Sequence, residues 1–167
     1  HPGWRVVVSS TTDTGLAEAR RRFPDLTVVP WPFDFTWAVA AAFDAVTPAV
    51  LVLTESELWP NALAVAGRRG VPVVLANARM SPRSARRLRR VGPARRVLFA
   101  RLARVAAQEA DYADRFRELG VPAGRVVVTG SVKYDGALKD RDTAATRQLA
   151  RQLGLGAGPD RGSGGVG

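Results

Sequence analysis

Short apolar runs alternate with amphipathic stretches along most of the chain, and turn residues separate them. Apolar runs rich in Val, Leu and Ala are typical of strands that are buried on both faces. They predict strands at residues 5–9, 26–29, 50–53, 71–76, 105–108 and 125–129. Apolar positions at helical spacing predict helices at residues 16–22, 36–45, 61–69, 81–90, 94–104, 111–119 and 142–153.

Strands that alternate with helices through short connections indicate a parallel sheet with helices on both faces. We therefore predict the α/β class, with a Rossmann-like three-layer domain over residues 1–153. Residues 154–167 are rich in glycine and poor in apolar side chains, so we expect a flexible tail or linker there. The loop after the first strand, residues 9–15, holds a single glycine. It therefore lacks the glycine-rich fingerprint of a nicotinamide or flavin site.

Composition narrows the chemistry. The chain has 167 residues, enough for one domain with a hydrophobic core, and it has no cysteine. Disulfides and thiolate metal sites are thereby excluded. The one histidine is His1, which argues against a histidine zinc site or a Ser-His-Asp triad within this chain. We expect neither a metal nor a cofactor, and no apolar run approaches the roughly 20 residues of a membrane helix.

Positive charge is concentrated in one part of the chain. The formal net charge is +10, and ten arginines but no acid lie between Arg79 and Arg104. Such a cluster attracts phosphates on nucleic acid, anionic lipid or a phosphorylated sugar. The alternative is a solvated helical face in a chain that contains 23 arginines and two lysines. Phe99 is the only aromatic residue within the run, and no recognition motif is present, which argues against nucleic-acid binding.

Polar residues follow three of the predicted strands. Glu55 and Glu57 come after the central strand, Arg79 and Ser81 after the next one, and Lys133 after the last. The carboxyl ends of parallel strands meet at the edge where open α/β folds bind ligands, so we expect one site. A carboxylate there can act as a base or accept hydrogen bonds from sugar hydroxyls. Arginine can clamp a phosphate or carboxylate, and lysine can neutralise developing negative charge.

A further candidate site lies ahead of the first predicted helix. Thr12, Thr14 and Gly15 offer hydroxyls and backbone amides at a helix N-terminus, where anions bind. Ordinary capping by Thr12 or Asp13 is the alternative. Similarly, the two glutamates after the central strand can simply complement the dipole of the helix that follows.

Several sequence words occur in a fixed order along residues 1–153. They are STTDTG at 10–15, ESELWPN at 55–61, ANARMSPRS at 76–84, AAQ at 106–108 and TGSVKYD at 129–135. In these words the chain resembles the amino-terminal half of the 3-deoxy-D-manno-octulosonic acid (Kdo) transferases specific for lipid A. That family consists of GT-B glycosyltransferases, which have two Rossmann-like domains and a cleft between them.

The resemblance implies transfer of Kdo from CMP-Kdo to the lipid A precursor, without a metal and with inversion of the anomeric centre. Glu55 aligns with a family glutamate that stabilises the transition state, and Lys133 aligns with a lysine of the same role. The acceptor-binding candidates are then Thr12, Thr14, Gly15, Glu57, Arg79 and Ser81. The implied location is the cytoplasmic face of the bacterial inner membrane, with an anionic membrane surface as a partner and no nucleic acid.

Two departures from the family pattern lead us to expect a fragment that is inactive alone. The family's base is a glutamate that would precede this chain's first strand. The donor-binding half would begin after about Leu155, where this chain runs into glycines. Apart from these two departures, the family's amino-terminal membrane anchor is also missing. The alternatives are another GT-B transferase with a different sugar donor and a basic, non-enzymatic nucleic-acid-binding module.

Overall fold

The computed structural model describes residues 3–132. By its contacts the chain divides after Ser131 into two units, and nearly all described residues belong to the first unit. The elements, in order, are β1 (Val7–Ser10), α1 (Asp13–Arg22), β2 (Thr27–Pro30), α2 (Thr36–Val46), β3 (Leu51–Thr54), α3 (Pro60–Arg68), β4 (Val73–Ala78), α4 (Pro82–Arg89), α5 (Ala94–Phe99), β5 (Leu102–Ala107), α6 (Ala110–Leu119), the 3-10 turn η1 (Ala123–Arg125) and β6 (Val126–Val128).

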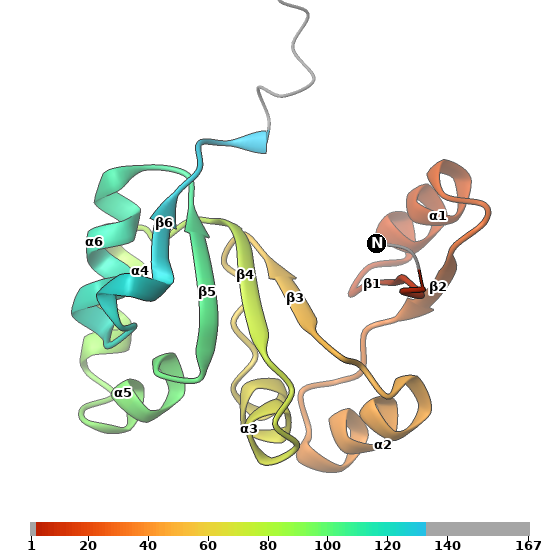
Figure 1. Ribbon diagram of the computed structural model, residues 1–167, viewed down its shortest axis with the longest axis horizontal. Helices are drawn as coiled ribbons and strands as arrows, with labels where there is room; N and C mark the ends of the chain where they lie inside the picture. The colour runs from red at the N-terminus through yellow and green to blue at the C-terminus, as the bar shows by residue number, and fades with distance from the viewer. Residues whose placement is uncertain (1–2, 133–167) are drawn as a thin grey trace, which may run out of the picture. The chain divides into compact units, whose positions relative to one another are not determined.

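Every strand pair is parallel, which confirms the predicted α/β class (Figure 1). Hydrogen bonds join the strands of the described residues into two sheets, where the sequence indicated one. β1 pairs with β2, and a four-stranded sheet has the order β3-β4-β5-β6. The strands of the larger sheet follow one another in both sequence and space, so their carboxyl ends share one edge.

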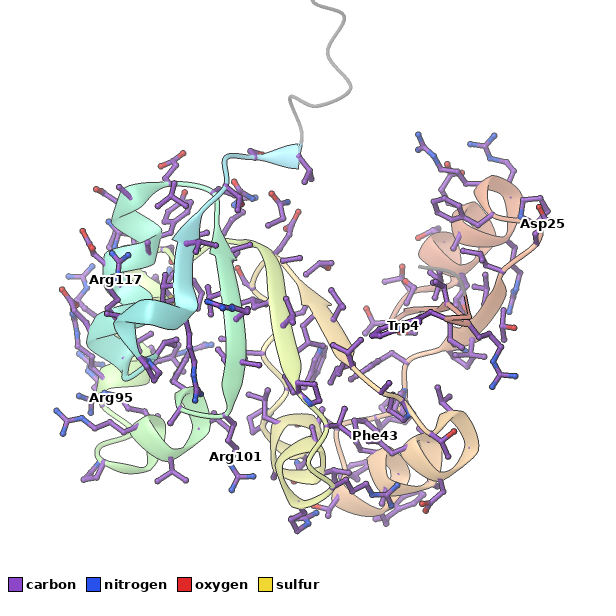
Figure 2. All side chains as sticks on the ribbon, in the orientation of Figure 1. Trp4, Asp25, Phe43, Arg95, Arg101 and Arg117 are labelled. Atoms are coloured by element: carbon purple, nitrogen blue, oxygen red, sulfur yellow. The ribbon has the colours of Figure 1, made fainter. Side chains whose placement is uncertain are left out.

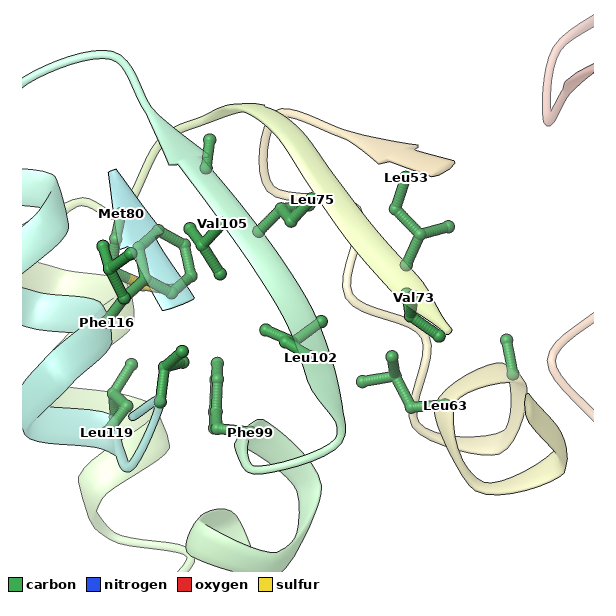
Figure 3. Packing of buried hydrophobic residues seen from close by; sticks show 14 of the residues in the cluster. Leu53, Leu63, Val73, Leu75, Met80, Phe99, Leu102, Val105, Phe116 and Leu119 are labelled. Carbon is green, nitrogen blue, oxygen red and sulfur yellow. The ribbon is translucent and has the colours of Figure 1, made fainter. Parts of the chain in front are cut away.

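The core lies on one face of the larger sheet, where residues of the strands pack with buried residues of helices α2 to α6 (Figure 3). Phe99 and Phe116 pack there with ring centroids 6.4 Å apart, and each is no more than 1% exposed. Val52 of β3 and Val127 of β6 keep 54% and 44% of their surface exposed. These two valines lie away from the core. The large apolar side chains of the core are buried instead, and their burial holds the helices against that face of the sheet.

One predicted helix is wrong. We expected residues 94–104 to form a single helix because Val97, Leu98, Leu102 and Val105 are at helical spacing. Helix α5 instead ends at Phe99, and β5 begins at Leu102. The register of β5 shifts by one residue between Leu102 and Arg104, which is an irregularity of the β-bulge type. That extra residue separates the fully buried Leu102 and Val105 by three positions, a spacing that also fits a helix.

The predicted helix at 142–153, the glycine-rich tail at 154–167 and Lys133 lie outside the described residues. The domain boundary at residue 153 therefore stays a prediction. Among residues 3–132, no helix has both the length and the apolar character needed to cross a membrane.

Candidate functional site

Four strands of the larger sheet end side by side, as their register shows. Thr54 lies opposite Ala76, and Ala107 lies opposite both Ala78 and Val128. The residues that follow these strands therefore share one edge, which carries Glu55, Arg79, Gln108 and Thr129 (Figure 1). The predicted meeting of the ESELWPN and ANARMS segments at a single edge agrees with this arrangement.

Glu55 has a strained backbone that neighbouring groups hold in place. Its φ is +56°, in the left-handed region that residues other than glycine rarely adopt. The Glu55 N–H donates to the carbonyl of Ala76 at 2.9 Å, and the Glu55 carbonyl accepts from the N–H of Arg79 at 3.2 Å. β3 and β4 thus hold the residue on both sides. Strain of this kind often accompanies a functional site.

Side chains reinforce the junction between the two segments. Ser56 Oγ donates to the carbonyl of Arg79 at 3.1 Å. Arg79 Nη1 lies 3.9 Å from Glu55 Oε2, and both side chains are about half exposed. An exposed ion pair at that distance is weak, so the guanidinium group retains donors for an anionic ligand.

Gln108 supports the same edge from β5, although the sequence gave it no role beyond its place in the AAQ word. Its Nε2 donates to the carbonyl of Asn77 at 3.0 Å, and its N–H donates to the carbonyl of Ala78 at 3.0 Å. Asn77 is left-handed as well, with φ of +51°. Gln108 thereby ties down the segment that carries Arg79.

Glu57 is exposed and does not cap helix α3. Its N–H donates to the carbonyl of Thr54 at 3.0 Å and closes the turn after β3. The helix is capped by Asp34 instead, whose carboxylate accepts from the backbone N–H groups of Asn61 and Ala62. Sequence reasoning missed this cap because it joins residues 27 and 28 positions apart.

Two of the hydroxyl candidates, Thr12 and Ser81, act as helix caps. Thr12 Oγ1 accepts from the N–H of Gly15 at 3.1 Å, and Ser81 Oγ accepts from the N–H of Ser84 at 3.1 Å. A Cβ on Gly15 would collide with Ser10 Oγ, so packing alone accounts for this glycine. Thr14 Oγ1 donates to Thr12 Oγ1 at 3.4 Å. Within residues 3–132, no hydrogen bond or ion pair joins Thr12, Thr14 or Gly15 to Glu55.

Two tryptophans near the site serve packing. The ring centroids of Trp31 and Trp59 are 6.4 Å apart, and both side chains pack against the hydrophobic core. In the described part of the chain, no group of three or more His, Cys, Asp or Glu side chains is placed so that it could hold a metal ion.

The ten clustered arginines fall into two groups. In the first group, three side chains donate to backbone carbonyls, namely Arg95, Arg101 and Arg104. Two more form ion pairs, namely Arg79 and Arg89. The other five are exposed, and their side chains have no hydrogen-bond or ion-pair partner in residues 3–132: Arg83, Arg86, Arg87, Arg90 and Arg96. Figure 2 labels Arg95 and Arg101, together with Arg117 of α6. Structural bonding thus explains about half of the cluster and leaves the rest available to anions.

In the comparison with protein families, residues 1–136 match the family described as 3-deoxy-D-manno-octulosonic-acid transferase (kdotransferase).

Curated relatives agree with that match. A 3-deoxy-D-manno-octulosonic acid transferase of Bordetella pertussis is 38% identical over 144 residues, which is 83% of this chain and 33% of the relative. The enzyme of the same name from Haemophilus influenzae is 29% identical over 136 residues, covering 81% of this chain and 32% of the relative. The chain thus spans about a third of the length of these relatives.

Solved structures share the fold. A UDP-GlcNAc 2-epimerase from Neisseria meningitidis bound to UDP-GlcNAc superposes with a TM-score of 0.55 at 15% identity. The alignment covers 89% of this chain and 45% of the epimerase. This likeness confirms the Rossmann-like half of a GT-B architecture, and at that identity it concerns the fold alone.

Proposed function

The chain belongs to the 3-deoxy-D-manno-octulosonic acid (Kdo) transferase family, and from this premise we propose that the edge around Glu55 is the acceptor side of a Kdo transfer site. The reaction is transfer of Kdo from CMP-Kdo to the lipid A precursor in lipopolysaccharide biosynthesis. The curated relatives are about three times as long as the matched segment. We therefore assign the donor site and the catalytic base to the parts of such an enzyme that lie outside this segment.

The strained backbone of Glu55 is the observation that carries the proposal. A carboxylate fixed at the edge of a parallel sheet can face the positive charge that develops on a sugar as its leaving group departs. The hydrogen bonds to Ala76 and Arg79 hold the backbone before substrate binds, so little reorganisation is needed during the reaction. The left-handed backbone of Glu55 at the sheet edge thus supports a functional role for this residue.

The proposed reaction is a single displacement. The base takes the proton of an acceptor hydroxyl, whose oxygen forms the new bond to the anomeric carbon. The bond from that carbon to the phosphate oxygen breaks, and CMP leaves with the electron pair. Glu55 stabilises the positive charge on the sugar, and Lys133 neutralises the negative charge on the leaving phosphate. Following the resemblance, we propose that the reaction is metal-independent and inverts the anomeric centre.

The arginines without partners suggest how the acceptor side approaches its lipid. Exposed guanidinium groups attract anionic headgroups and the phosphates of the acceptor. We propose that the protein acts peripherally at the cytoplasmic face of the inner membrane. Glu57, Arg79 and Ser81 are acceptor-binding candidates at the same edge, and Thr12, Thr14 and Gly15 remain candidates at the start of α1.

Binding to the 167-residue chain at physiological salt tests the proposal. The two probes are a bisphosphorylated lipid A precursor and CMP-Kdo. We expect binding of the glycolipid and none of the nucleotide sugar, because the donor site is assigned to another part of the enzyme. Binding of neither, together with salt-sensitive binding to any DNA duplex, would overturn the acceptor-side assignment and favour a nucleic-acid module.

A further inference from the structure

An open pocket of about 370 Å³ lies between helices α4 and α6, outside the edge that carries Glu55. Its lining consists of Pro82, Ala85, Arg86, Arg89, Arg115 and Glu118. Three guanidinium groups face one carboxylate, so the lining has a net charge of +2. Of these residues, only Pro82 belongs to the matched sequence words, and the proposed chemistry at Glu55 uses none of them.

The three arginines differ in how they are held. Arg115 donates to the carbonyl of Met80 at 3.1 Å and to Asp111 at 3.3 Å, and its side chain is only 21% exposed. Arg89 pairs with Glu118 at 2.7 Å. Arg86 is exposed, and its side chain has no hydrogen-bond or ion-pair partner among residues 3–132. The pocket thus combines two fixed guanidinium groups with one whose donors are all available.

The pocket also adjoins the candidate site through the chain. Arg115 contacts the backbone of Met80, which directly follows Arg79, and Arg79 contacts Glu55. A ligand held by Arg86 and Arg115 therefore lies beside the connection between β4 and α4, close to the proposed acceptor edge.

We propose that this pocket binds a phosphate monoester group and, resting on the proposed function, that it holds a phosphate of the glycolipid acceptor. A phosphate monoester carries a charge of about −1.5 to −2 at pH 7 and three strong acceptor oxygens. The lining has the opposite charge, with a net +2 that becomes +1 when Asp111, the ion-pair partner of Arg115, is counted. A phosphodiester carries a single charge and offers fewer free oxygens, so phospholipid headgroups and DNA fit the pocket less well. Arginine forks bind such oxygens in pairs.

Binding of the full 167-residue chain to vesicles tests the site. The probes are phosphatidylcholine vesicles that contain a bisphosphorylated lipid A precursor, and vesicles of equal surface charge that contain phosphatidylglycerol. Arg86→Gln is the test variant. Arg87→Gln is the matched control, because Arg87 is exposed on the same helix and does not line the pocket, and its side chain has no partner in residues 3–132. Both variants remove one charge.

We expect Arg86→Gln to weaken binding to the glycolipid vesicles by about fivefold or more, the effect of losing one charge-assisted contact. Arg87→Gln is expected to weaken it less than twofold, and the two variants are expected to behave alike on phosphatidylglycerol. Equal losses on the glycolipid would overturn the pocket and leave only diffuse attraction between surfaces.

A second pair of variants works in the opposite direction. Glu118→Gln removes the one carboxylate of the lining and frees Arg89 from its ion pair, so we expect tighter binding of the phosphorylated lipid. Asp114→Asn, which breaks the ion pair with Arg117 outside the pocket, is the control. The site is overturned if Glu118→Gln weakens binding or if both variants change it equally.

Titration with inorganic phosphate tests the pocket independently of the proposed function. In the 167-residue chain, the Nε–H resonances of Arg86 and Arg115 are expected to shift on titration with phosphate at 150 mM salt, while that of Arg87 is not. Shifts without any binding of the glycolipid would uphold the pocket and count against the acceptor assignment. Absent shifts, or larger shifts with a DNA duplex, would overturn the phosphate monoester site itself.

Discussion

Asp34 caps helix α3, although α2 and β3 lie between them in the sequence. Its carboxylate accepts from the backbone N–H of Asn61 at 3.1 Å and from that of Ala62 at 3.0 Å. Asn61 Nδ2 returns a hydrogen bond to the backbone carbonyl of Asp34 at 2.6 Å. Trp59, at the N-cap position, provides no side-chain cap. The helix that follows the Glu55 turn therefore depends on Asp34 for its start.

We predict that Asp34→Ala lowers the free energy of unfolding of the chain by about 1–2 kcal/mol, the range for loss of a helix cap. Urea denaturation followed by circular dichroism measures it. Asp25→Ala is the control, because Asp25 is exposed and has no partner in residues 3–132, and it is expected to change stability by less than about 0.5 kcal/mol. Equal midpoints for Asp34→Ala and the unmodified chain would contradict the capping role.

We predict that the left-handed backbone of Glu55 lowers the free energy of unfolding of the chain. A left-handed residue with a Cβ costs about 1–2 kcal/mol, and glycine avoids that cost. Glu55→Gly and Glu55→Ala both lose the carboxylate, so their difference isolates the backbone. We expect the glycine variant to be more stable than the alanine variant by about 1 kcal/mol in urea denaturation. A more stable alanine variant would show that the backbone is not strained.

The catalytic assignments predict a large loss of turnover. The measurement uses a chimera in which residues 1–136 of this chain replace the matched segment of the Bordetella pertussis relative. Glu55→Ala and Lys133→Ala are each expected to lower turnover by about 10²-fold or more, the scale for removal of one transition-state contact. Glu18→Gln, on the exposed surface of α1, is the control. A variant that keeps full turnover would lose its assigned role.

The core predicts a contrast between two phenylalanines. Phe99 is 1% exposed and Phe33 is 82% exposed. Phe99→Ala is expected to cost about 3–5 kcal/mol, and Phe33→Ala less than about 0.5 kcal/mol, in urea denaturation. Since the larger loss approaches the stability of a small domain, Phe99→Leu, at roughly 1 kcal/mol, is the variant to measure if Phe99→Ala does not fold. Equal costs at the two positions would contradict the packing in Figure 3.

The order of strands and helices could largely be predicted from the sequence, because a short apolar run between turn residues is typical of a strand in a buried sheet. The meeting of Glu55 and Arg79 was readable for a related reason. Parallel strands bring their carboxyl ends together, and both residues directly follow such strands. The family match over residues 1–136 confirms the resemblance found in the sequence words.

The end of α5 was not readable, because one inserted residue in β5 gives its buried positions the spacing of a helix. Period alone cannot separate the two structures over so short a stretch. Only the pairing of β5 with β4 decides the matter, and that pairing depends on residues far away in sequence.

The sequence by itself determined which residue types follow each strand, and hence where the candidate site lies in the fold. Tertiary structure decided how those residues are held: the left-handed turn at Glu55, the support of Asn77 by Gln108 and the capping of α3 by Asp34. These contacts join residues that are 21 to 31 positions apart, or they involve backbone angles that local preference disfavours. Local sequence patterns carry no information about them, because their energy is realised only when the strands are paired and the helices packed.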